Sequence, residues 1–89
     1  MKLKSGFFLN EMGDEFVVVA MTEEAKKVFG GMLRLNGTGA FLFEQLESEK
    51  TYQQLALALA EEYSVDADMA KSVCVEFIDT LRGVGLIDE

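Results

Sequence analysis

The chain has few side chains that are suited to catalysis. Histidine is absent, which removes the commonest general base and the commonest metal ligand. The one cysteine, Cys74, therefore has no histidine to activate it as a nucleophile. Cys74 also falls on the apolar side of a predicted helix, where a free cysteine packs as a small hydrophobic residue. The sequence predicts that Cys74 is a core residue and that the protein is not an enzyme.

The acidic and glycine-rich segments do not complete a binding motif for a metal or a phosphate. Asp66 and Asp68 begin like a calcium loop. That loop needs a glycine at its sixth position and a glutamate at its last, where this chain has Lys71 and Phe77. The glycines around Asn36 fit neither a phosphate-binding loop nor a dinucleotide fingerprint. We expect solvated carboxylates, helix-capping glycines, and neither metal nor cofactor.

Hydrophobic periodicity predicts β-strands in the first part of the chain and helices in the rest. Three strands are expected, at residues 6–12, 15–21 and 31–35. Gly13-Asp14 suits a tight hairpin turn between the first two strands, and we place the short third strand at a sheet edge. Three helices are expected, at residues 37–47, 52–63 and 67–82, with N-caps at Asn36, Thr51 and Asp66. This order predicts an α+β, winged-helix-like fold: a three-stranded antiparallel β-meander followed by a three-helix bundle.

Two further patterns complete the predicted elements. Large apolar residues recur along the last helix at a spacing of one turn and predict its core face: Met69, Val73, Phe77 and Leu81, widened by Ala70, Cys74 and Ile78. The charged connector at residues 22–27 is given one helical turn capped by Thr22. A short apolar tail is expected to pack back onto the core with Val84, Leu86 and Ile87.

Composition limits the classes of partner. Eighty-nine residues predict a single domain over residues 1–89. Sixteen acidic against eight scattered basic residues give a net charge of −8, which opposes a nucleic-acid partner. The N-terminal apolar run is too short for a signal peptide, and no stretch approaches a membrane span. We therefore expect a cytoplasmic protein with no membrane partner.

Binding by the third strand is the function that the residues favour. An edge strand presents unpaired amides and carbonyls, and another strand can add to them. Residues 32–35 carry one charge, on Arg34, and are therefore weakly protected against such pairing. The alternative is that the domain's own tail, or a second copy of the chain, covers this strand.

A family resemblance supports the binding hypothesis. The run Leu35-Asn36-x-Thr38-Gly39-Ala40 is its most specific part, and the hydrophobic pattern continues to Gly85-Leu86-Ile87. The chain resembles the coenzyme PQQ synthesis protein D family, the prototype of the leader-peptide recognition elements of ribosomally made, modified peptides. It departs from the family pattern at Gly37, where an acidic residue is expected, and at Phe43, near which a tryptophan is often found.

The resemblance implies a non-catalytic chaperone. Such a protein holds the leader of a precursor peptide and presents it to a radical SAM enzyme. The leader is implied to add as a strand beside the third strand, in the cleft against the last helix. The residues implied at this site are Gly31, Met32, Leu33, Arg34 and Leu35 on the strand, and Val73, Glu76, Phe77, Thr80 and Val84 on the helix side. Some family members exchange their N-terminal hairpin, so a homodimer is compatible with the resemblance.

Two other functions remain alternatives at the level of sequence. The last two helices, joined by a short turn, also fit a winged-helix transcription regulator, although the acidity opposes it. A structural module docked to a larger enzyme would have the same fold but no peptide groove of its own.

Overall fold

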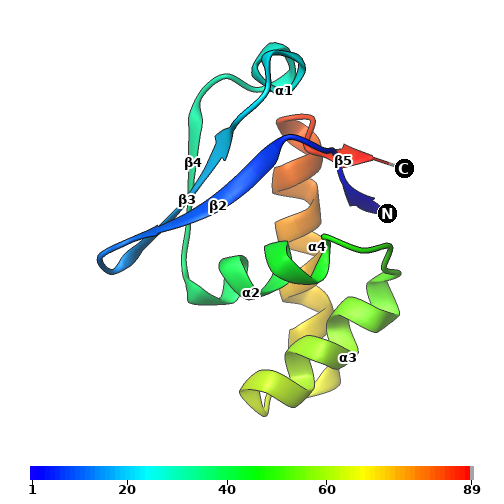
Figure 1. Ribbon diagram of the computed structural model, residues 1–89. Helices are drawn as coiled ribbons and strands as arrows, with labels where there is room; N and C mark the ends of the chain where they lie inside the picture. Colours follow the sequence, from blue (N-terminus) through cyan, green and yellow to red (C-terminus); the bar gives the residue numbers. More distant parts are fainter. Residues whose placement is uncertain (89) are drawn as a thin grey trace.

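The computed structural model describes residues 1–88 and shows a three-stranded sheet beside a group of helices (Figure 1). The sheet is antiparallel in the order β2-β3-β4, with β2 (Phe7–Met12), β3 (Glu15–Ala20) and β4 (Met32–Leu35). The helices are α1 (Glu23–Val28), α2 (Gly37–Gln45), α3 (Tyr52–Tyr63) and α4 (Ala67–Gly83). Two short strands, β1 (Lys2–Leu3) and β5 (Ile87–Asp88), pair with each other. The predicted α+β class with a three-stranded antiparallel sheet is confirmed.

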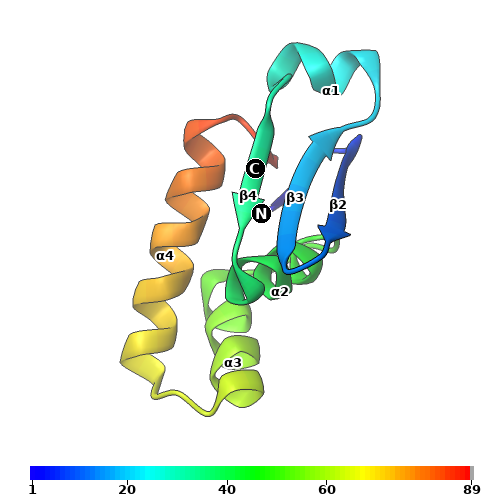
Figure 2. The ribbon, with the colours of Figure 1, turned by 90° about the vertical axis from the view of Figure 1, so that its left-hand side faces the viewer.

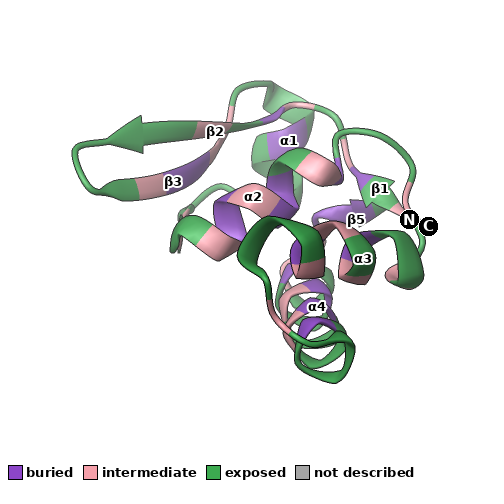
Figure 3. Ribbon diagram, turned by 90° about the horizontal axis from the view of Figure 1, so that it is seen from below, coloured by how far each residue is buried: buried purple, intermediate pink, exposed green. Residues whose placement is uncertain are grey.

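The β2–β3 hairpin carries the central strand of the sheet. It turns at Gly13-Asp14 as expected, and Gly13 has a φ of 64°, which a two-residue turn with glycine in first place requires. Val17 and Val18 of β3 are buried, whereas the tip of the hairpin is exposed (Figure 3). Met21, which we expected inside the strand, lies just beyond its end and is exposed.

A fourth helix, α1, lies between β3 and β4, so the predicted order of strands first and helices afterwards is incomplete. The one turn expected at residues 22–27 is a helix of six residues. The Thr22 hydroxyl accepts a hydrogen bond from the amide of Ala25 at 3.0 Å and caps it, as predicted. Glutamates in its first turn and lysines in its last turn favour the helix dipole. α1 carries the chain from the central strand to the edge strand.

The pairing of the two chain ends was not foreseen. β1 and β5 are antiparallel, with Leu3 opposite Ile87. Gly85 turns the chain after α4 with a φ of 81°, and the amide of Leu86 then donates to the carbonyl of Leu81 at 2.9 Å. Leu86 and Ile87 are buried, so the apolar tail does pack on the core as expected. Strands of two residues carry no periodicity by which a sequence could reveal them.

The core face of α4 differs from the prediction. The buried residues are those that we had placed at its margin, namely Ala70, Cys74 and Ile78, together with Leu81. Met69 is 55% exposed, and Val73 and Phe77 are half-buried on one flank. The buried face of α4 thus contains the small residues Ala70 and Cys74, which permit a close approach of neighbouring elements such as α3. α4 has 17 residues, and no helix within residues 1–88 is both long and apolar enough to cross a membrane.

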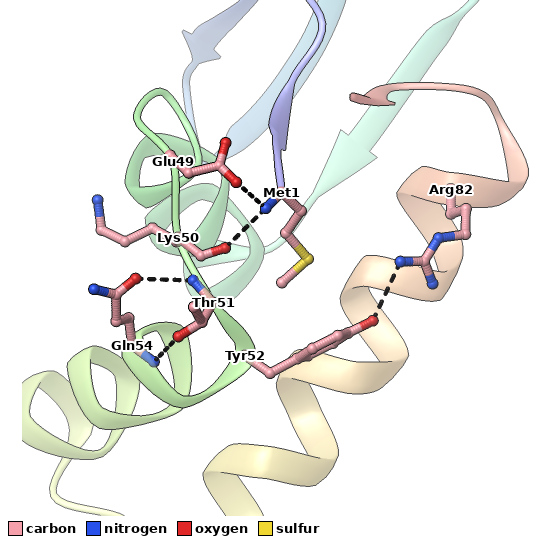
Figure 4. A network of polar contacts seen from close by, with 7 residues as sticks. All are labelled: Met1, Glu49, Lys50, Thr51, Tyr52, Gln54 and Arg82. Atoms are coloured by element: carbon pink, nitrogen blue, oxygen red, sulfur yellow. Dashed lines mark hydrogen bonds and ion pairs between the residues drawn. The ribbon is translucent and has the colours of Figure 1, made fainter. Parts of the chain in front are cut away.

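Polar contacts fix the start of α3 between the N-terminus and α4 (Figure 4). The Thr51 hydroxyl accepts from the amide of Gln54 at 3.1 Å, and the Gln54 side chain accepts from the amide of Thr51 at 2.9 Å, which completes a capping box. The Met1 ammonium donates to the Lys50 carbonyl at 3.1 Å. Tyr52 Oη and a guanidinium nitrogen of Arg82 lie 3.4 Å apart and link α3 to the last turn of α4. Asn36 and Asp66 cap α2 and α4 in the same way as predicted.

Removing the cap of α3 should weaken the fold. We expect Thr51→Ala to lower the free energy of unfolding by about 1 kcal/mol, because the amide of Gln54 loses its acceptor. Urea unfolding followed by circular dichroism measures this difference. Thr51→Ser keeps the hydroxyl and should unfold close to the wild type. An alanine variant as stable as the serine variant would show that the capping box is not a stabilising contact.

Cys74 should be protected by the core. Its side chain is 1% exposed, and burial raises the pKa of its thiol, so the reactive thiolate is depleted in the folded state. We expect labelling by a disulfide reagent at pH 8 to be on the order of 100-fold slower in the native protein than in urea, because reaction requires opening of the core. Equal labelling rates in the two conditions would contradict the core assignment.

Candidate functional site

The free edge of β4 is the candidate binding feature of the fold. β4 pairs with β3 on one side, and no other strand within residues 1–88 pairs with it. Figure 2 shows α4 on its open side. The alternative that the C-terminal tail covers this edge is wrong for the described chain, because β5 pairs with β1. The edge therefore presents backbone amides and carbonyls that can bind another strand.

The side chains of β4 alternate between two environments. Leu33 and Leu35 are half-buried and pack against the core. Met32 is 69% exposed on the opposite face, as is Arg34, which lies 3.7 Å from Glu15 of β3 in an exposed ion pair. Arg34 thus belongs to the outer face of the sheet. The side that faces the helices is apolar along the whole strand.

α4 forms the opposite wall with the flank that it leaves out of the core. Val73 and Phe77 are half-buried there, and Glu76 and Thr80 are exposed beside them. These four residues line a cavity of about 250 Å³, which also has lining residues at the start of α2: Asn36, Thr38, Gly39 and Leu42. A cavity of this size can take about one side chain. The structure therefore brings together four of the five residues that were expected on the helix side.

Gly39 sets how closely the three walls approach. A Cβ atom at this position would lie 3.3 Å from each of three atoms, namely Leu35 Cβ, Asn36 Oδ1 and Phe77 Cε1. This spacing is tighter than ordinary van der Waals contact. The missing side chain lets the end of β4, the start of α2 and the middle of α4 meet at one point.

Two predicted site residues lie elsewhere. Gly31 precedes β4, which begins at Met32, and a Cβ there would lie 3.3 Å from the ring of Phe29. Val84 caps the far end of α4 and does not line the cavity. A Cβ on the next residue, Gly85, would lie 3.1 Å from Val28 of α1. The C-terminal end of α4 at Val84 is therefore close to α1 and away from the cavity.

The contribution of α2 was missed from the sequence. The run from Asn36 to Gly39 predicted a strand running into a helix but was not recognised as part of the groove. The signal that could have shown it is Gly39, since a glycine inside a helix is unfavourable unless a close contact requires it. Leu42, 1% exposed, forms the buried floor one turn later.

A larger hollow of about 640 Å³ lies on the other side of α4. Residues of α3 and of the start of α4, among them Ala56, Leu57 and Lys71, line it. Most of its lining residues belong to helices, whose backbone groups are already hydrogen-bonded within the helix, and none belongs to an unpaired strand edge. It shares no lining residue with the cavity at Glu76. We place the candidate site at β4 because an unpaired backbone edge lies there, with the cavity between α2 and α4 just beyond its end.

The cavity between α2 and α4 offers groups for binding. Its lining consists of backbone, apolar side chains, hydroxyls, one amide and the Glu76 carboxylate. Cys74 faces the core and is not among its lining residues. Within residues 1–88, no three histidine, cysteine or acidic residues are grouped so that they could hold a metal ion.

Comparison with known proteins places the chain in a family. The model of the family "Coenzyme PQQ synthesis protein D" matches residues 15–87. No curated protein matches the sequence. One similar solved structure is TbiB1 in complex with the TbiA(beta) leader peptide: the TM-score is 0.76 at 23% identity, over 99% of this chain and 95% of that one. Another is lasso peptide synthetase B1 complexed with its leader peptide, with a TM-score of 0.72 at 19% identity, over 96% of this chain and 93% of that one. These likenesses show a common fold, and with the match over residues 15–87 they establish that the chain belongs to the coenzyme PQQ synthesis protein D family.

Proposed function

We propose that this protein binds the leader of a ribosomally made precursor peptide by strand addition to β4 and presents the peptide to a modifying enzyme. The observation that carries the proposal is the unpaired edge of β4, which has α4 on its open side and the cavity between α2 and α4 just beyond its end (Figure 2). Main-chain hydrogen bonds to this edge would supply affinity that depends little on the peptide sequence. Side chains entering the groove would supply the selectivity.

The geometry supports an extended peptide as the ligand. β4 has four residues, about 13 Å of strand, so it can pair with a short segment of a longer chain. Every second side chain of an added strand would point toward α4, where Val73 and Phe77 form an apolar wall. The remaining side chains would lie beside Met32 and Arg34 on the outer face.

The comparisons support the same ligand class. Family membership points to a protein of modified-peptide biosynthesis, and both similar structures are complexes with leader peptides. We extend the proposal to a non-catalytic role in the cytoplasm, as a single domain that works with a radical SAM enzyme. Exchange of the β2–β3 hairpin between two copies stays a prediction, which light scattering would test.

We do not propose the transcription regulator. α4 carries Lys71 and Arg82 against three acidic residues, and Arg82 lies 3.4 Å from one of these, Asp79. A helix of this charge would not be attracted to phosphates.

Proline substitutions in β4 should separate peptide binding from folding. The amides of two neighbouring strand residues point to opposite edges, so of Leu33 and Arg34 one donates toward β3 and the other toward the free edge. One of the variants Leu33→Pro and Arg34→Pro therefore removes an amide from the free edge. That variant should stay folded and lose at least about 10-fold in affinity, through a lost hydrogen bond and the bulk of the ring. The probe is a strand-forming peptide selected on the wild type from a randomised library, and amide-resolved NMR reports both fold and binding.

The alanine variants at the same two positions are the controls, because they keep both amides. They should bind the selected peptide within a few-fold of the wild type. A proline variant that is folded, has lost a free-edge amide and still binds with wild-type affinity would rule out strand addition at β4.

A further inference from the structure

The cavity at the end of the groove has a floor and a rim of different character. Leu42, Val73 and Phe77 make the floor apolar, and Glu76 and Thr80 stand on the rim. The Thr80 hydroxyl donates to the backbone carbonyl of Glu76 at 3.1 Å, one helical turn away. The Thr80 side chain is therefore held beside Glu76. The carboxylate of Glu76 is the only charged group that lines this cavity in the described part of the chain.

Glu76 has no counter-charge of its own. Within residues 1–88, no cationic group lies within 4.0 Å of its carboxylate. The positions three and four residues away on α4 hold Ser72, Val73, Asp79 and Thr80, none of them basic. An ion pair with a neighbouring turn of the helix is thus unavailable to it.

Asp79, the neighbouring acidic residue on α4, has a basic partner. Asp79 lies 3.4 Å from Arg82 and has its charge compensated. Asp79 also does not line the cavity, whereas Glu76 does. The local charge at the groove therefore comes from Glu76, in a protein whose net charge is already −8.

We propose that this cavity selects a lysine or arginine side chain of the bound leader. The methylene stem would pack on Val73 and Phe77, and the cationic head would reach Glu76 at the rim. Long basic side chains bury their stems on apolar surface in this way while the charge stays in contact with water. This inference rests on the proposed strand addition, since a strand on β4 directs every second side chain toward this wall.

The rim formed by the start of α2 is electropositive, in contrast to the rim at Glu76. This difference limits where the cationic head of the bound side chain can lie. The start of α2 carries a partial positive charge of about half a unit. Asn36 Oδ1 already accepts from the amide of Gly39 at 2.7 Å, which compensates part of it. The full charge of Glu76 outweighs the remainder, so the cationic head would lie on the α4 side of the cavity.

The effect should appear as selectivity more than as affinity. An exposed carboxylate paired with a basic side chain contributes modestly, and the attraction weakens as salt is added. An acidic leader residue at the same position would instead be repelled. We therefore expect Glu76 to decide which peptides are accepted among many that can pair with the backbone of β4.

Selection from a peptide library tests the inference on the full chain. A randomised peptide of about 12 residues is long enough to cover β4 and its flanks. It would be selected in parallel on the wild type, on Glu76→Lys and on the control Glu47→Lys, which makes the same charge change at an exposed position of the α2–α3 connection. We expect enriched lysine or arginine at one position on the wild type and on the control, and aspartate or glutamate there on Glu76→Lys.

A single selected peptide then gives the magnitude. Changing its enriched basic residue to glutamate should weaken binding to the wild type by about 5-fold and restore it on Glu76→Lys. Peptides that shift the β4 amides in NMR but show no charge preference at any position would overturn this inference and leave strand addition intact. A selection that yields no peptide, or only peptides that shift amides away from β4, would overturn both this inference and the proposed function.

Discussion

The close approach of three elements at Gly39 is the constraint on which the groove depends. With no side chain there, Leu35 at the end of β4 and Phe77 of α4 both lie close to the first turn of α2. This meeting point holds one end of β4 near α4. A larger residue would push α4 away from the strand, and the cavity at Glu76 would lose a wall.

The two chain ends keep the edge of β4 open. After α4, the left-handed turn at Gly85 leads the chain to β1, so the tail uses its backbone groups in that pair. The same tail buries Leu86 against the core and leaves β4 uncovered. A tail that continued toward the sheet would have satisfied the free edge and removed the binding surface. The C-terminal strand β5 thus pairs with β1, and the edge of β4 that α4 flanks stays unpaired in the described part of the chain.

Much of this arrangement could be predicted from local sequence. The N-caps at Asn36, Thr51 and Asp66, the hairpin turn at Gly13 and the edge position of the third strand follow from rules that act over a few residues, and all are observed. The parts that were missed depend on distant contacts. The β1–β5 pair joins residues from the two ends of the chain, and two residues of strand leave no pattern.

The core face of α4 was also predicted wrongly from local sequence. The residues concerned line the candidate site. Size and hydrophobicity alone favoured Val73 and Phe77 as core residues, but the buried residues of α4 include the smaller Ala70 and Cys74. Val73 and Phe77 are only half-buried and line the cavity between α4 and the start of α2. The core leaves these apolar side chains partly exposed near an unpaired strand. A bound peptide could cover them. The error in the predicted core face therefore falls on residues of the proposed groove, where selection for binding competes with selection for packing.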